Sequence, residues 1–129
     1  FAGFLTGREA ARYMTERGRG TILFTGATAS VRGAAGFAAF ASAKHGLRAL
    51  AQSMARELWS QNIHVAHIVI DAAVDTAWIA ENLPDYDARK TQEGIVKPED
   101  LAEHYVWLHE QPRSAWTFEL DVRPWVETW

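Results

Sequence analysis

Cysteine is absent from this chain of 129 residues, which excludes both disulfide bridges and thiolate metal ligands. The absence is compatible with a reducing compartment, and we expect a cytoplasmic protein. No apolar run approaches the ~20 residues that a bilayer-spanning helix needs, so we predict no membrane partner. Basic residues do not outnumber acidic residues, and the formal net charge is −3 at pH 7. We therefore expect no nucleic-acid partner.

The sequence does not begin with methionine. Phe1 opens a segment that is apolar from its first residue, with no basic region or cleavage signal before it, and this pattern predicts a fragment. The length allows one domain with a core and is too short for two. We expect residues 1–129 to form a single partial domain whose missing part lies upstream.

Helical and strand patterns alternate along the chain. Helical spacing over about 4–17 ends at Gly18, and a long alanine-rich helix over about 37–60 ends at Gln61. Short apolar runs predict buried parallel strands at 21–25, 63–70 and 116–120. A short helix near 78–82 and a helix over 98–110 complete the order. This order predicts an α/β fold, a three-layer Rossmann-like parallel sheet with about three strands and four helices.

Phe40 and Lys44 form the most informative pair of residues. Positions four apart lie on one helix face, so the ring and the ammonium group are expected to face the same space. A tyrosine at position 40 would make the pair a proton-transfer device, since the lysine charge would lower the phenol pKa. Phenylalanine cannot transfer a proton.

Together these features resemble the C-terminal half of the short-chain dehydrogenase/reductase family. The residues that carry the resemblance are the strand at 20–25, the pair Phe40 and Lys44 in place of Tyr-x-x-x-Lys, the strand at 63–70, and the segment from Asp71 to Thr76 in place of Pro-Gly-x-x-x-Thr. The resemblance covers nearly the whole chain. It implies that the cofactor-binding N-terminal half of a doubly wound fold is missing.

The resemblance also implies roles for particular residues. In the family the tyrosine is the general acid or base, the lysine holds the nicotinamide ribose, and a serine polarises the substrate carbonyl. Ala27 stands at the serine position and Phe40 at the tyrosine position, so both hydroxyl groups are missing while Lys44 remains. Lys44, Val74 and Thr76 are the expected cofactor contacts, with NAD or NADP in the full-length parent and no tight binding to the fragment. No metal is expected.

Other residues in this region have competing interpretations. Ser30 is our candidate for a substitute hydroxyl, against ordinary loop capping, and Thr28 is also near in sequence; His45 should face elsewhere. The segment 25–30 looks like the opening of a phosphate loop but has Ser30 where close approach to pyrophosphate needs glycine, so a plain loop is favoured. Lys44 itself is either a cofactor ligand or a solvated charge.

Several further residues are interpreted as structural. His64 and His67 lie three apart in a strand, point to opposite faces and cannot chelate one metal together. Asp71 and Asp75 are interpreted as turn and cap residues. Trp78 belongs either to a substrate lid or to simple packing. Four tryptophans gather near the end of the chain and predict a packed or interface tail: Trp107, Trp116, Trp125 and Trp129.

Two functions remain open at this stage. The first is an NAD(P)-dependent oxidoreductase that acts on a carbonyl or alcohol group of a small molecule, with an atypical active site and an inactive isolated fragment. The second is a non-catalytic relative that binds nucleotide or assembles. In the family the two helices beside the first strand here pair across a twofold axis, and the slim alanine-rich face of 38–55 suits such packing. A homodimer or homotetramer is therefore expected.

Overall fold

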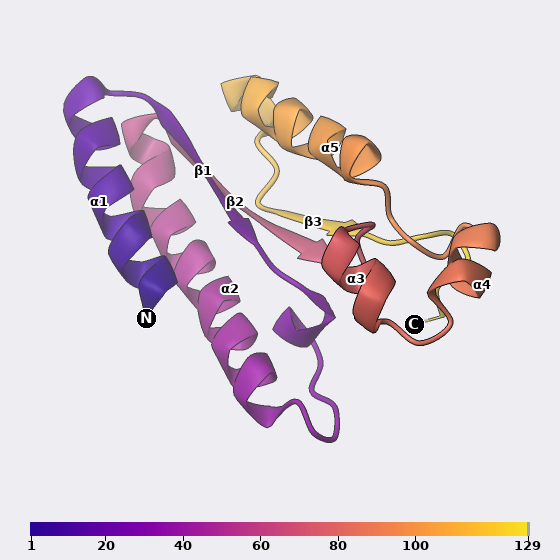
Figure 1. Ribbon diagram of the computed structural model, residues 1–129. Helices are drawn as coiled ribbons and strands as arrows, with labels where there is room; N and C mark the ends of the chain where they lie inside the picture. The colour runs from indigo at the N-terminus through magenta and orange to yellow at the C-terminus, as the bar shows by residue number, and fades with distance from the viewer. Residues whose placement is uncertain (129) are drawn as a thin grey trace.

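The computed structural model describes residues 1–128 (Figure 1). Trp129 lies outside the described residues, and with it one member of the predicted tryptophan-rich tail. The chain begins with α1 (Ala2–Arg17), which ends at Gly18 in the left-handed conformation, with φ of 67°. Glycine adopts this conformation without a Cβ penalty. The predicted helix and its glycine stop are both confirmed.

The part of the chain that the structure describes has three strands in one parallel sheet: β1 (Gly20–Thr25), β2 (Ile63–Ile70) and β3 (Glu119–Val122), in the order β1-β2-β3. The register places Thr25 opposite Ile68, and Ile70 opposite Val122, so the carboxyl ends of the strands meet at one edge. Within residues 1–128, β1 pairs with β2 alone. Its outer edge is therefore unpaired within the described residues.

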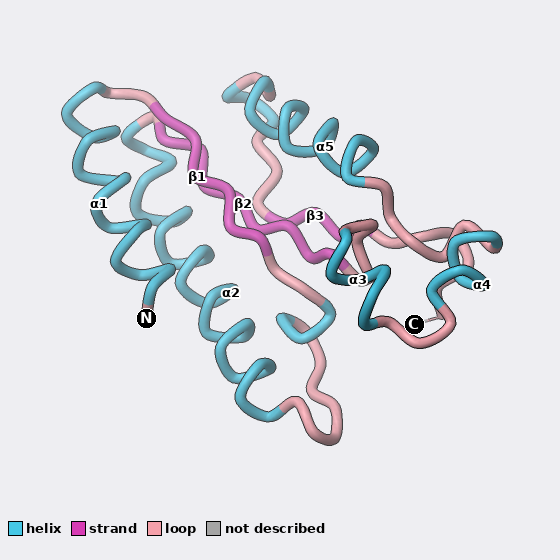
Figure 2. Tube along the Cα trace, in the orientation of Figure 1, coloured by secondary structure: helices cyan, strands magenta, loops and turns pink. Residues whose placement is uncertain are grey.

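Helices cover both faces of the sheet and make three layers (Figure 2). α1 and α2 (Ala38–Leu58) lie side by side against one face, while α5 (Pro98–Glu110) covers the other (Figure 1). Every residue of β2 is buried, and alternate side chains enter two apolar clusters. Full burial of one such Ile or Val side chain stabilises the fold by about 1.5–3 kcal/mol. The predicted Rossmann-like α/β fold is confirmed.

Two details differ from the expected architecture. The last strand starts three residues later than expected, because Trp116 stacks on His64 with ring centroids 4.8 Å apart, and the Thr117 backbone N–H donates to the Gln111 side chain at 2.8 Å. Residues 1–128 form five α-helices where about four were expected: besides α3 (Ala77–Asn82), a further short helix, α4 (Tyr86–Thr91), follows Asp85, whose φ is 60°. The polar composition of that stretch concealed it.

The described helices include none that is both long enough and apolar enough to cross a membrane.

Candidate active site

The carboxyl edge of the sheet carries the residues that the sequence singled out. Ala27 and Ser30 follow β1, Val74 and Thr76 follow β2, and the first turns of α2 bring Phe40 and Lys44 beside the end of β1. α3 and α4 lie beyond the tips of β2 and β3 (Figure 1). In open α/β sheets ligands bind outside this edge of the sheet, so the arrangement marks it as the candidate site.

Lys44 reaches from α2 to the end of β1. Its Nζ donates to the Thr25 carbonyl oxygen at 2.9 Å and lies 5.7 Å from the centre of the Phe40 ring. The ring and the ammonium group do share one space, as predicted. Because an ammonium group has three donors, Lys44 keeps two for a ligand. Phe40 is 47% exposed and offers an apolar face without a hydroxyl group.

The turn after β1 is closed by Ser30. The Ser30 hydroxyl accepts a hydrogen bond from the Ala27 backbone N–H at 3.1 Å, and the residue has no exposed surface. This geometry matches the capping alternative, and it turns the hydroxyl inward. A Cβ on Gly26 would lie 2.4 Å from His67 Nε2 and 2.8 Å from Ser30 Oγ. Position 26 therefore requires glycine because there is no room for a Cβ atom.

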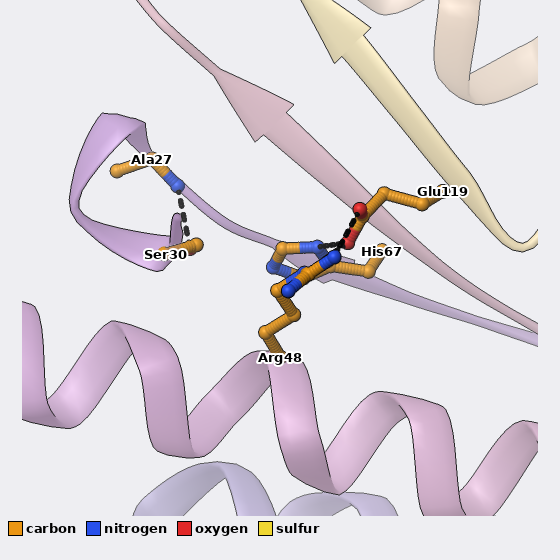
Figure 3. Close-up of polar contacts among 5 residues, drawn as sticks. All are labelled: Ala27, Ser30, Arg48, His67 and Glu119. Atoms are coloured by element: carbon orange, nitrogen blue, oxygen red, sulfur yellow. Dashed lines mark hydrogen bonds and ion pairs between the residues drawn. The ribbon is translucent and has the colours of Figure 1, made fainter. Parts of the chain in front are cut away.

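Behind this turn lies a polar cluster of His67, Glu119 and Arg48 (Figure 3). Glu119 accepts two hydrogen bonds from the Arg48 guanidinium, at 2.6 and 2.8 Å, and lies 2.9 Å from His67 Nδ1. Figure 3 shows the His67 ring between that carboxylate and the turn bearing Ala27 and Ser30. His67 Nε2 is buried and has no hydrogen-bond partner among the described residues. The cluster fixes the imidazole from one side.

Burial and charge act on this cluster in opposite directions. The Arg48 hydrogen bonds lower the pKa of the Glu119 carboxyl, and His67 adds to this, although burial opposes it. Burial lowers the pKa of the His67 imidazole more than Glu119 raises it. The Glu119 hydrogen bond also raises the pKa of Arg48. We therefore describe the cluster near neutral pH as neutral imidazole beside a carboxylate–guanidinium pair.

Asp71 ends β2 in a second polar cluster. Its side chain accepts a hydrogen bond from the Thr28 hydroxyl and makes ion pairs with Arg32 at 3.7 Å and Arg123 at 3.6 Å. Asp71 is only 5% exposed. The interpretation of Asp71 as a turn residue is therefore wrong: its carboxylate joins the segments that follow all three strands. An aspartate directly after a wholly buried strand was the sequence signal.

The segment after β2 is held in an extended form by a bridge between Val74 and Val96. The Ala73 carbonyl and the Asp75 N–H make its hydrogen bonds, at 3.0 and 2.8 Å, whereas the peptide groups of Val74 bond to no other part of the described chain. Thr76 caps α3 by accepting from the Ile79 N–H at 3.2 Å, so its hydroxyl proton remains to be donated. Among the described residues, the Val74 peptide and the Thr76 hydroxyl proton therefore remain available to a ligand.

Asp75 belongs to a third cluster, on α4. Tyr86 Oη donates to Asp75 Oδ1 at 2.5 Å, and Lys90 Nζ lies 2.9 Å from both Tyr86 Oη and Asp75 Oδ2. The Tyr86 hydrogen bond, then Lys90, lowers the pKa of Asp75, and the same contacts raise the pKa of Lys90. The cap assignment for Asp75 is therefore wrong, since Thr76 is the cap. Asp75 clamps α4 onto the loop instead.

The two histidines of β2 point to opposite faces, as predicted. His64 stacks on Trp116, and its Nε2 lies 2.8 Å from the Thr117 carbonyl oxygen, while His67 faces α2 through Arg48 and Glu119. His45 bonds its own helix at the Ala41 carbonyl oxygen, at 2.9 Å. Trp78 is 67% exposed on α3.

Comparison with known proteins identifies the family of this chain. The model of the short chain dehydrogenase family matches residues 1–87. The chain belongs to the short-chain dehydrogenase family. A curated member from Melia azedarach, (21S)-21-acetoxyl-apo-melianone synthase, is 31% identical over 114 residues, which are 82% of this chain and 41% of the relative.

Solved short-chain dehydrogenase structures share the fold. A short-chain dehydrogenase from Rhodopseudomonas palustris is 52% identical, with a TM-score of 0.74, over 96% of this chain and 47% of that one. A 7α-hydroxysteroid dehydrogenase complexed with NADH has a TM-score of 0.80 at 23% identity, over 95% of this chain and 50% of that one. This chain thus spans about half the length of these relatives.

Proposed function

We propose that this chain is the C-terminal half of an NAD(P)-dependent short-chain oxidoreductase acting on an alcohol or carbonyl group of a small molecule in the cytoplasm. The observation that carries the proposal is the combination of Lys44, with two donors to spare, and the unpaired peptide of Val74 at one edge of the sheet. Thr76 supplies the third group. NAD or NADP is the proposed cofactor, and the 7α-hydroxysteroid dehydrogenase with this fold was solved with NADH.

The cofactor supplies hydride chemistry, and the chain supplies position and proton management. Lys44 and Thr76 would hold the ribose and phosphate, and the Val74 peptide the carboxamide. The family's two hydroxyl groups have no counterpart at Ala27 and Phe40. Without a positioned acid or base the rate falls by about 10²–10⁴-fold, or ~3–5.5 kcal/mol of barrier. The isolated chain, which is about half of the fold, is expected to bind no cofactor tightly and to be inactive.

The test uses the full-length protein with oxidised and reduced NAD and NADP and a panel of alcohols and ketones. Change in absorbance of the reduced nicotinamide measures turnover, and fluorescence of the reduced cofactor measures binding. Binding with turnover supports the proposal. Binding with a flat trace across the panel refutes catalysis and supports the second candidate.

That second candidate is a non-catalytic member that binds nucleotide or assembles. It is favoured by the joint absence of hydroxyl groups at Ala27 and Phe40. The double variant Ala27→Ser, Phe40→Tyr discriminates the two functions. A large gain of turnover from an inactive parent implies a decayed site, whereas an active parent that gains little has another proton route.

We also propose that the protein is a homodimer or homotetramer through the outer faces of α1 and α2. These helices line a groove of about 470 Å³ whose apolar residues include Phe4, Leu50 and Met54, and Phe4 is 49% exposed. Arg8 and Glu57 line the same groove and offer charges of opposite sign. Analytical ultracentrifugation of the full-length protein tests this, and a clean monomer at micromolar concentration contradicts it.

A further inference from the structure

The carboxyl edge lacks the family's two hydroxyl groups but has another hydroxyl beside a proton acceptor. Thr28 is adjacent to Ala27, is half-buried, and donates to the buried Asp71 carboxylate. Ser30 has no exposed surface and its hydroxyl lies inside the turn. Thr28 thus keeps some exposed surface at this turn, whereas Ser30 keeps none.

We infer that Thr28 and Asp71 form the proton relay that replaces the missing phenol, an inference that rests on the proposed oxidoreductase function. In alcohol oxidation the substrate O–H proton passes to Thr28 Oγ1 as the Thr28 proton passes to Asp71 Oδ1. The nicotinamide that Lys44, Thr76 and the Val74 peptide would hold would accept the C–H hydride as the carbonyl product forms. The proton left on Asp71 returns to solvent before the next turnover, so alcohol and oxidised nicotinamide give carbonyl, reduced nicotinamide and one proton. In reduction a proton from solvent follows the same path in reverse.

The surroundings of Asp71 suit an acceptor. Its ion pairs with Arg32 and Arg123 keep the side chain in place as an acceptor for the Thr28 hydroxyl. Asp71 itself is buried, and a hydrogen bond to a buried charged group is among the stronger kinds. The contacts come from the segments after β1, β2 and β3, so the carboxylate is fixed relative to the whole edge. Positioning of this kind is what general-base catalysis needs.

A second phenol–ammonium pair, Tyr86 and Lys90, is the competing proton source. Both partners are engaged with Asp75, which lies between Val74 and Thr76 in an extended segment. Alternate side chains of such a segment point to opposite sides, so Asp75 faces away from the side that Val74 and Thr76 share. Figure 1 also places α4 on the far side of α3 from the start of α2. Thr28 is next to the serine position and Tyr86 is not.

The variants that test the relay are made in the full-length protein. Thr28→Val removes the hydroxyl and keeps the branched shape, Thr28→Ser restores the hydroxyl, and Asp71→Asn removes the acceptor with little change of volume. Thr91→Val and Asp87→Asn on α4 are the matched controls for the chemical changes. Thr91 bonds only its own helix, and Asp87 is exposed.

We expect Thr28→Val and Asp71→Asn each to lower kcat for alcohol oxidation by about 10²–10⁴-fold. The dissociation constant of the reduced cofactor should stay within about twofold, and the double variant should be no worse than either single one, since coupled residues are not additive. Thr28→Ser should recover most of the rate. Phe40→Tyr added to Thr28→Val should also recover turnover, because it restores the family's phenol.

A spectroscopic readout is independent of turnover. The infrared carboxylate band assigned to Asp71 by its loss in Asp71→Asn should shift in Thr28→Val, measured without cofactor, and stay in place in Thr91→Val. Undiminished turnover in both Thr28→Val and Asp71→Asn overturns the relay while leaving the proposed function intact. A loss of turnover in Tyr86→Phe, with Thr28→Val fully active, also overturns the relay and leaves the proposed function intact. A wild-type protein that binds cofactor and oxidises no alcohol overturns the proposed function and the relay's catalytic role with it.

Discussion

Glu119→Gln is the sharpest test of the cluster behind the turn. The carboxylate receives two hydrogen bonds from Arg48, at 2.6 and 2.8 Å, and one from His67 at 2.9 Å. The amide keeps one acceptor oxygen and replaces the other with an NH₂ group, which must face a guanidinium or imidazole N–H. At least one contact therefore becomes donor against donor, and the charge of the partner is lost.

The expected loss follows from these contacts. A hydrogen bond to a charged group is worth about 1.5–3 kcal/mol. The Arg48 side chain is 42% exposed and that of Glu119 25%, so solvent screens part of the ion pair. His67 can soften the loss by moving its proton to Nε2, which lies near the Ser30 turn. We therefore expect Glu119→Gln to lower the free energy of unfolding by about 2 kcal/mol.

Urea unfolding of the full-length protein at pH 7 measures this change, read as a lower midpoint with an unchanged slope. Glu103→Gln on α5 is the matched control, since Glu103 is exposed and contributes to no ion pair among the described residues. The control should change the free energy of unfolding by less than about 0.5 kcal/mol. Equal midpoints for the two variants would refute a stabilising role for the cluster.

Three further predictions concern the same edge. Gly26→Ala should destabilise the fold by about 1–3 kcal/mol in urea unfolding, because its Cβ would meet His67 and Ser30; wild-type stability contradicts this. Lys44→Met should raise the dissociation constant of the reduced cofactor at least about tenfold, ~1.4 kcal/mol, and should lower the urea midpoint slightly because the hydrogen bond to the Thr25 carbonyl oxygen is also lost; unaltered binding would contradict a cofactor role for Lys44. Burial lowers the pKa of His67 below 6.5, so stability should be complete above pH 6.5 and fall as the pH drops through the lowered pKa. His67→Gln should flatten that fall.

The fold could be predicted from the sequence because its signals are local. A mostly apolar run between Asn62 and Asp71 marks the ends of β2, and Gly18 stops α1 by a conformation that glycine adopts freely. The start of β3 could not be placed in this way, because it depends on the stacking of Trp116 on His64, residues far apart in sequence. α4 was missed because its packing comes from one clamp to Asp75 rather than from an apolar face.

Some contacts of the candidate site could likewise be predicted from the sequence, and others could not. Phe40 and Lys44 could be paired from helical spacing alone, and the structure joins them. The Thr28–Asp71 contact could not, since it joins the segments after β1 and β2. The His67–Glu119 contact could not either, since it joins two residues that the sheet register places opposite each other on β2 and β3. Sequence patterns give the face on which a residue lies, while the register decides which residues meet.

The register also separates the proposed cofactor contacts from the proposed proton relay. The proposed cofactor contacts are Lys44 on α2 and the segment after β2, which is held by a bridge to Val96. The resemblance aligns Ala27 and Phe40 with the family's two hydroxyl positions, and neither residue belongs to the segment after β2. Proton transfer can therefore move to Thr28 without rebuilding cofactor binding. Restored turnover in Phe40→Tyr, Thr28→Val would demonstrate that separation directly, because both proton routes would then serve one unchanged cofactor side.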